Sequence, residues 1–224
     1  MARFELIGTA TIPGRGTELK LLQRNDEFSI KIAGSTGELM NSRLHGSEDA
    51  LATLACERIA GNPEPHVLIG GLGMGFTLAA ALESLGGDAQ VTVAELVPEV
   101  VEWNRGALGA AAGNPLRDPR AKVHLGDVGL LLQESDGRYD AILLDVDNGP
   151  EGLTRKENDW IYSSAGIAAA QSALRPEGIL AYWSAGQDHD FTERLRKMGF
   201  AVEAVTVRAH RPGKGARHVI WLAW

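Results

Sequence analysis

The sequence predicts an α/β fold in which a mostly parallel sheet ends in an antiparallel hairpin, with a small β-rich element before it. Short apolar strand patterns alternate with helix-compatible segments from residue 66 onward, which is typical of a parallel sheet with crossover helices. A run of glycines separates the first of these strands from the following helix, and the last two strand patterns flank a polar turn. We therefore expect an N-terminal β-rich element over residues 1–45 and one α/β domain over residues 46–224.

Composition and charge exclude several classes of protein. Of the 224 residues, 44% are hydrophobic and 23% are charged, which allows a folded core and does not indicate disorder. The net charge of −7 disfavours a nucleic-acid-binding protein, which normally has a basic surface. No apolar stretch reaches the ~20 residues of a membrane-spanning helix, and the first residues lack the apolar core of a signal peptide. The single cysteine, Cys56, cannot form an internal disulfide. We expect a cytoplasmic protein without nucleic-acid or membrane partners.

The N-terminal element is predicted from two strand patterns, at residues 18–23 and 27–32, with a polar turn between them. Residues 38–43 can form another short strand. Ser47 is a candidate N-cap for a following helix, because two acids come directly after it, where the helix dipole favours negative charge. Exposed strand edges on this element would suit a homodimer interface.

The remainder is predicted to alternate strands and helices. The fourth strand pattern is highly apolar, which is typical of a central strand. Pro98 suits the first turn of a helix because its missing N–H group is not needed there. The expected strands are 67–69, 91–94, 121–125, 139–145, 179–183, 201–210 and 218–224, and the expected helices are 78–85, 98–108, 128–132, 162–174 and 190–198.

The turn after the first of these strands is the strongest functional signal. Its four glycines, Gly70, Gly71, Gly73 and Gly75, lie within six residues. Glycine tolerates positive φ and has no Cβ, so a ligand can approach bare backbone at the start of the next helix. The second strand is followed by Glu95, about 20 residues on, where a Rossmann-type unit places its ribose-binding acid. The combination predicts an adenosine-type cofactor.

Several motifs resemble the class I S-adenosylmethionine-dependent methyltransferase fold, a Rossmann-like sheet with a C-terminal antiparallel hairpin. Besides the glycine turn and Glu95, they are Gly126 and Asp127 after the third strand, Asp145 after the fourth, and residues 174–178 before the fifth. Within this fold the chain is most similar to the spermidine synthase (polyamine aminopropyltransferase) group, over nearly its whole length. The N-terminal β block, the fourth strand with its Gly-Pro loop and a following Trp-Ile-Tyr sequence are typical of that group. The resemblance implies that residues 46–224 bind S-adenosylmethionine or its decarboxylated form, without a metal.

The resemblance also implies a role for each matching residue. Glu95 would accept hydrogen bonds from the ribose hydroxyls, and Asp127 would lie near the adenine amino group. Asp145 would orient the reacting amine and accept its proton, with Asp147 as a second catalytic acid. Structural alternatives remain open: Glu95 as a solvated helix-capping acid, Asp127 as a turn residue, and Asp145 as an acid that binds loop amides. The cofactor-binding residues would be Gly71, Gly73, Met74, Gly75, Glu95 and Asp127.

Three departures from the family patterns change the expected chemistry. The aminopropyltransferase loop reads Gly-Gly-Gly-Asp-Gly-Gly-Thr-Leu, and here Met74 replaces the acid that would hold the amino group of decarboxylated S-adenosylmethionine. An acid there would repel a cofactor carboxylate, so its absence removes a barrier to ordinary S-adenosylmethionine. In the loop that the family writes Asp-Ser-Ser/Thr-Asp-Pro, the second acid is displaced to Asp147 or replaced by Asn148. Of the Tyr-His-Glu triplet that helps to bind polyamine, only Glu48 is present.

The candidate substrate-binding residues are Glu48, Asn148, Trp160 and Tyr162. An aromatic ring can pack on a sulfonium cation or an alkyl amine, but both aromatic residues can equally be packing residues at the start of a helix. A basic group near the C-terminus could bind an anionic substrate, although a solvated hairpin tip is the simpler interpretation. Its members are Arg208, His210, Arg211, Lys214, Arg217 and His218.

The sequence therefore favours an S-adenosylmethionine-dependent transferase that moves a methyl group to a small acceptor, with amines among the candidates. The leaving thioether is activated by the positive sulfur, so the protein chiefly has to align the acceptor with the carbon. Aminopropyl transfer from decarboxylated S-adenosylmethionine is the alternative, and a non-catalytic cofactor-binding partner subunit is the second alternative.

Overall fold

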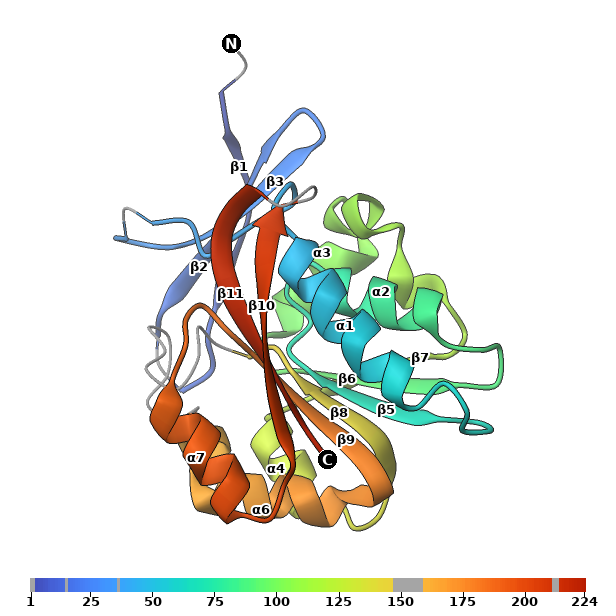
Figure 1. The fold of residues 1–224 in the computed structure, drawn as a ribbon. Coiled ribbons are helices and arrows are strands. Elements are labelled where there is room, and N and C mark those ends of the chain that lie inside the picture. The colour runs from blue at the N-terminus through green and yellow to red at the C-terminus, as the bar shows by residue number, and fades with distance from the viewer. Residues whose placement is uncertain (1–2, 15, 36, 147–158, 211–213) are drawn as a thin grey trace.

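The computed structural model describes residues 3–14, 16–35, 37–146, 159–210 and 214–224 (Figure 1). Within these ranges the strands form two sheets, one of four strands and one of seven. The four-stranded sheet is built from the N-terminal part of the chain, and the seven-stranded sheet from the remainder.

The N-terminal sheet is antiparallel, in the order β1-β2-β3-β4. Its strands are β1 (Glu5–Thr11), β2 (Glu18–Arg24), β3 (Glu27–Ile32) and β4 (Met40–Asn41). The turn between β2 and β3 contains Asn25 with a φ of 57°, a left-handed conformation that asparagine tolerates. The predicted hairpin is therefore present. Leu21, Phe28 and Ile30 are buried and form a hydrophobic cluster with Phe76 of the main domain.

The strands of the larger sheet are β5 (His66–Gly70), β6 (Gln90–Glu95), β7 (Ala121–Leu125), β8 (Tyr139–Leu144), β9 (Leu174–Ser184), β10 (Val202–His210) and β11 (Lys214–Ala223). Their order is β10-β11-β9-β8-β5-β6-β7, with β9 to β7 parallel and the two C-terminal strands antiparallel. Every residue of β8 is buried, as expected for a central strand. The strand order reverses between β5 and β8, and open α/β sheets bind ligands at the carboxyl ends of strands at such a point.

Helices cover both faces of this sheet (Figure 1). They are α1 (Gly46–Arg58), α2 (Phe76–Ser84), α3 (Pro98–Arg105), α4 (Val128–Gln133), α5 (Asp159–Tyr162), α6 (Ser164–Ala173) and α7 (His189–Lys197). Two 3₁₀ helices, Leu108–Ala112 and Pro115–Arg117, follow α3. Successive strand residues point to opposite faces: Val67 and Ile69 pack with α1 to α3, and Leu68 packs with α4, α6 and α7. Two hydrophobic layers therefore hold the sheet.

The first helix, α1, packs against the C-terminal hairpin. Arg58 donates a hydrogen bond of 2.7 Å to Glu203, and its guanidinium lies 4.3 Å from the centre of the Trp224 ring. At the other end of α1, a Cβ on Gly46 would lie 2.9 Å from the carbonyl oxygen of Arg208. A tyrosine at this position, as in the family triplet, would overlap the backbone of β10.

One sequence prediction about a helix end is wrong. Ser47 does not cap α1: the N-cap is His45, and the Ser47 hydroxyl donates to Glu48 instead. The helix predicted over 162–174 is present as α6, which starts where the Ser163 hydroxyl accepts a hydrogen bond from Gly166; the short helix α5 before it is not among the predicted helices. The other predicted helices and strands are present with ends shifted by a few residues.

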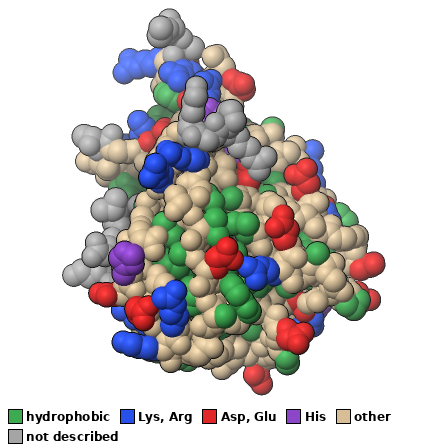
Figure 2. Space-filling model, viewed as in Figure 1, with side chains coloured by type: hydrophobic (Ala, Val, Ile, Leu, Met, Phe, Trp, Pro, Cys, Tyr) green, Lys and Arg blue, Asp and Glu red, His purple; other side chains and the backbone are tan. Residues whose placement is uncertain are grey.

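The surface drawn in Figure 2 carries interspersed acidic and basic side chains, with hydrophobic side chains near its centre. In the part of the chain that the structure describes, no helix has both the length and the apolar character to cross a membrane.

Candidate active site

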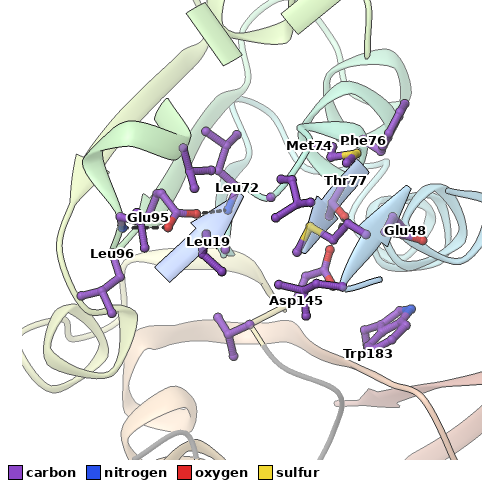
Figure 3. A pocket seen from close by; sticks show the side chains of 18 of the residues that line it. Leu19, Glu48, Leu72, Met74, Phe76, Thr77, Glu95, Leu96, Asp145 and Trp183 are labelled. Atoms are coloured by element: carbon purple, nitrogen blue, oxygen red, sulfur yellow. Dashed lines mark hydrogen bonds between the residues drawn. The ribbon is translucent and has the colours of Figure 1, made fainter. Parts of the chain in front are cut away.

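A cavity of about 440 Å³ lies at the carboxyl ends of the parallel strands (Figure 3), within the range of roughly 300–1,000 Å³ typical of small-molecule sites. The N-terminal sheet supplies an apolar wall, and the C-terminal hairpin closes another side. The wall from the N-terminal part contains Ile12, Leu19, Ile30, Leu39 and Met40. The predicted site residues that line the cavity are Glu48, Gly71, Gly73, Met74, Glu95, Asp127 and Asp145.

The glycine loop has the backbone conformation that its sequence predicts. Gly71, Gly73 and Gly75 have φ values of 90°, 52° and 86°, in the region that favours glycine. A Cβ on Gly71 would also overlap the carbonyl oxygen of Asp145 at the end of β8. Gly75 is not among the described lining residues but is the N-cap of α2. The loop therefore presents a bend without side chains to the cavity at Gly71 and Gly73.

Glu95 holds this loop against the start of α3. Its Oε2 accepts a hydrogen bond of 2.9 Å from the backbone N–H of Leu72, and its Oε1 accepts one of 2.8 Å from Val97 (Figure 3). The residue is only 8% exposed, so it is not a solvated acid. Burial raises the pKa of Glu95, while the backbone donors act in the opposite direction. Each carboxylate oxygen has a further lone pair that can accept a ligand hydroxyl.

Asp127 combines a structural contact with a place in the cavity wall. Its Oδ1 accepts a hydrogen bond of 2.7 Å from the backbone N–H of Gly129 and so caps α4. The structural alternative for Asp127 therefore accounts for one of its contacts. Because Asp127 and Gly126 also line the cavity, the same loop is available to a ligand.

Asp145 and Glu48 form the acidic centre of the cavity. The Oδ2 of Asp145 accepts a hydrogen bond of 2.7 Å from the Thr77 hydroxyl. Burial raises the pKa of Asp145 to about 6, although the Thr77 hydrogen bond acts against this rise. Burial and the charge of Asp145 raise the pKa of Glu48 to about 7. Both carboxyl groups therefore gain and lose protons close to neutral pH, which is typical of acid–base groups in active sites.

Glu48 is connected to the C-terminal hairpin through a serine. The Ser47 hydroxyl donates to Glu48 Oε2 over 2.6 Å, and His218 Nδ1 lies 2.8 Å from Ser47 Oγ. The His218 ring meets the Trp183 ring edge-on, with 4.7 Å between their centres. His218 is thus a partly buried residue of the cavity wall and not part of a solvated hairpin tip.

Met74 lies on the apolar side of the cavity. It is 4% exposed and belongs to the cluster that includes Leu21, Phe28 and Ile30. The side chain that stands where aminopropyltransferases have an acid therefore offers a ligand a hydrophobic surface and no charge.

Of the aromatic candidates, Tyr162 lies in the core and Trp160 is half-buried against it. Tyr162 packs with Tyr182 and Phe191, at ring-centre distances of 5.5 and 5.3 Å. The Trp160 ring packs over Gly129, where an added Cβ would approach it to 3.3 Å. Neither aromatic residue is among the described residues that line the cavity, so the packing alternative describes both. The two remaining candidates, Asp147 and Asn148, lie outside the described residues.

Sequence reasoning missed four residues of this site: Ser47, Thr77, Trp183 and His218. Thr77 follows the glycine loop in the position of the family's threonine, so the motif itself contained the signal. Trp183 comes at the carboxyl end of the fifth predicted strand, on the edge where ligands bind. The contact of Ser47 with His218 joins residues 171 positions apart, and no local pattern indicates it.

Comparisons with known proteins identify the family of the chain. The family model described as the spermine/spermidine synthase domain matches residues 52–197. A polyamine aminopropyltransferase of Korarchaeum cryptofilum (strain OPF8) is 29% identical over 125 residues, which are 56% of this chain and 36% of that protein. The chain thus spans about a third of the length of this curated relative.

Solved structures show the same fold. A spermidine synthase in complex with the transition-state analogue AdoDATO aligns over 99% of this chain and 73% of its own, with a TM-score of 0.73 and 16% identity. The spermidine synthase of Thermotoga maritima aligns over 97% and 71%, with a TM-score of 0.72 and 16% identity. The predicted α/β fold, with its mostly parallel sheet and C-terminal hairpin, is confirmed. Since the family model covers more than half of the sequence, the chain belongs to the spermine/spermidine synthase domain family.

Proposed function

We propose that the protein transfers an aminopropyl group from decarboxylated S-adenosylmethionine to a small amine. The observation that carries this proposal is the acid pair Glu48 and Asp145, which faces the same cavity as the glycine loop and Glu95. Family membership and the aminopropyltransferase relative favour an aminopropyl group over the methyl group that the sequence alone favoured.

The adenosine part of the donor fits one side of the cavity. Glu95 offers a buried carboxylate to the ribose hydroxyls, and Gly71 and Gly73 provide a bend without side chains beside it. Gly126 and Asp127 line the wall proposed for adenine. The donor supplies a carbon that the positive sulfur has activated, so the main task of the protein is to hold this carbon in line with the acceptor.

The acceptor amine fits the other side, where Figure 3 shows Glu48, Asp145 and Trp183. Two carboxylates attract an ammonium group, and their raised pKa values suit them to take its proton near neutral pH. The neutral amine then forms the N–C bond as the C–S bond breaks. The Trp183 ring offers an aromatic face to the alkyl chain of the amine.

Methyl transfer from S-adenosylmethionine is the second candidate, and Met74 is the observation that favours it. Its apolar side chain can neither bind the ammonium group of the decarboxylated donor nor repel the carboxylate of ordinary S-adenosylmethionine. The two candidates place the nucleoside and the amine in the same positions and differ in which carbon is attacked.

The test is an incubation of the protein with each donor and a mixture of mono- and diamines, followed by mass analysis. Aminopropyl transfer yields 5′-methylthioadenosine and an amine heavier by one aminopropyl group. Methyl transfer yields S-adenosylhomocysteine and a methylated amine. Failure to consume either donor, or turnover that survives Asp145→Asn unchanged, would overturn the proposal.

We also propose that the protein forms a homodimer through its N-terminal sheet. Strand β1 is one of the two edge strands of this sheet, and two of its residues, Leu6 and Ile7, are 54% and 43% exposed. Size-exclusion chromatography with light scattering tests this proposal: Leu6→Lys should convert a dimer into a monomer, and a wild-type monomer would contradict it.

A further inference from the structure

A chain of hydrogen bonds connects the acidic centre of the cavity to the C-terminal hairpin. Ser47 is completely buried and lies between two ionisable groups. Its hydroxyl is 2.6 Å from Oε2 of Glu48 and 2.8 Å from Nδ1 of His218. A hydroxyl can donate one hydrogen bond while it accepts another, so this serine can pass a proton between an acid and an imidazole.

This chain of hydrogen bonds ends at a partly exposed side chain, the imidazole of His218. His218 belongs to β11, lies partly buried in the cavity wall, and packs against the Trp183 ring. The titratable and charged groups on the elements around this chain of hydrogen bonds are Asp145 after β8, Asp49 of α1 with its partner His45 at the N-cap, and Arg208 and Arg217 on the paired strands of the hairpin. A partly exposed imidazole can exchange a proton with water, whereas Ser47 cannot.

We propose that Ser47 and His218 are positioning residues. They carry a proton from Glu48 to solvent, and this proton is the one that group transfer releases. This inference rests on the proposed function, because the transfer is what delivers a proton to Glu48. An ammonium group that becomes a secondary ammonium releases one proton, while one N–C bond forms and one C–S bond breaks. The path removes this proton and returns Glu48 to its ionised form for the next turnover.

The path works by a paired shift of two protons. When Glu48 is protonated, its O–H donates to Ser47 and the Ser47 O–H donates to Nδ1 of His218. After the shift, Glu48 is a carboxylate that accepts from Ser47, and His218 is an imidazolium that donates from Nδ1. Water then takes the Nε2 proton and leaves His218 as the Nδ1–H tautomer. The path can operate again once His218 has exchanged to the Nε2–H tautomer. The two heavy-atom distances are compatible with both arrangements.

The electrostatics of the two ends support this exchange. Burial and the charge of Asp145 raise the pKa of Glu48 to about 7. Burial lowers the pKa of His218 from its ordinary value of 6.5. Near pH 7 Glu48 therefore exists in both protonation states, and His218, which holds a proton less strongly, gives its proton up to water.

The first test measures the imidazole directly and requires no turnover. Nitrogen NMR of histidine-labelled protein at pH 9 should show neutral His218 as the Nδ1–H tautomer, since Ser47 then donates to ionised Glu48 and accepts from His218. Ser47→Ala should return His218 to the Nε2–H tautomer. If His218 of the wild-type protein shows the Nε2–H tautomer at pH 9, or keeps the Nδ1–H tautomer in Ser47→Ala, the path does not exist.

The second test separates proton transfer from structure. His218→Asn keeps a donor near the position of Nδ1 but cannot titrate, so kcat should fall about tenfold or more at pH 7 while the KM for the nucleoside donor is unchanged. Added imidazole buffer should restore the rate in proportion to its concentration. His189→Asn, on the exposed start of α7, is the matched control and should behave as wild type. If kcat of His218→Asn is normal, or is low with no response to buffer, His218 does not carry protons.

The two proposals fail in different ways. A wild-type protein that consumes neither donor contradicts the proposed function, whatever the NMR measurement gives. An active wild-type protein whose His218 is the Nε2–H tautomer at pH 9 contradicts the proton path and leaves the proposed function intact.

Discussion

Replacement of Asp145 by asparagine should stabilise the folded protein above neutral pH while it abolishes group transfer. Asparagine keeps an oxygen that can accept the hydrogen bond from Thr77 but removes the charge that burial disfavours. It also removes the charge that contributes to the raised pKa of Glu48. A residue that serves catalysis is thereby expected to destabilise the fold that contains it.

The magnitude follows from the pKa values. Burial places the pKa of Asp145 at about 6 and that of Glu48 at about 7, above their ordinary values of 3.8 and 4.5. The folded chain therefore binds more protons than the unfolded chain between about pH 4 and pH 7, so the free energy of unfolding falls as the pH rises through this window. At about 1.4 kcal/mol per pKa unit, ionised Asp145 costs about 3 kcal/mol. Water in the cavity screens part of this cost, and we expect a gain of about 1–2 kcal/mol for Asp145→Asn at pH 8.

Urea unfolding at pH 4 and pH 8, with linear extrapolation to water, measures the effect. The gain should be present at pH 8 and vanish near pH 4, where the carboxyl group is neutral in the folded chain. Asp140→Asn is the matched control at the other end of β8. Asp140 accepts hydrogen bonds of 2.7 Å from Arg175 and from the backbone N–H of His66, so its loss should destabilise the protein by about 1–3 kcal/mol. Equal destabilisation by the two variants at pH 8 would refute the argument from burial.

Three further predictions concern the glycine loop and the core. Glu95→Gln should lower the free energy of unfolding by about 2 kcal/mol and weaken nucleoside binding in calorimetry, because its amide nitrogen would face the N–H of Leu72 or Val97; unchanged binding would remove Glu95 from the ribose site. Gly71→Ala should lose about 2 kcal/mol or more, since its φ of 90° strains alanine, and a urea midpoint equal to wild type would contradict the loop geometry. Burial raises the pKa of the Cys56 thiol to about 12, so Cys56 should react with a thiol reagent at pH 8 only after unfolding. Rapid labelling of native protein would show that the thiol is accessible.

The parts of the structure that the sequence predicts depend on local patterns. Alternation and apolar runs locate the strands, because the side-chain period of a strand is a property of neighbouring residues. Gly71 and Gly73 are identified by the run of glycines after a strand, and the structure confirms their positive φ. Glu95 is identified by its distance along the chain from that loop. Asp145 follows in the same way, since parallel strands bring their carboxyl ends to one edge.

The parts that the sequence does not predict depend on contacts between distant segments. Ser47 is a residue type that often caps helices, so the sequence predicts a cap. Only the folded chain brings His218 beside it. Gly46 is explained by the close approach of β10, which follows it by some 160 residues in the sequence. Tyr162 is an aromatic residue that the sequence places near a substrate pocket. In the structure it packs with Tyr182 and Phe191 and is buried in the core. Burial of this kind is decided by tertiary packing and leaves no short-range signal.

The central claim is that an amine meets a sulfonium nucleoside between the acid pair and the glycine loop, and a crystal structure with 5′-methylthioadenosine and an amine tests it most directly. We predict that the ribose hydroxyls bind the Glu95 carboxylate and that the amine nitrogen lies about 2.6–3.2 Å from a carboxylate oxygen of Asp145 or Glu48. A nucleoside bound elsewhere, or an amine without contact to either acid, would contradict the claim.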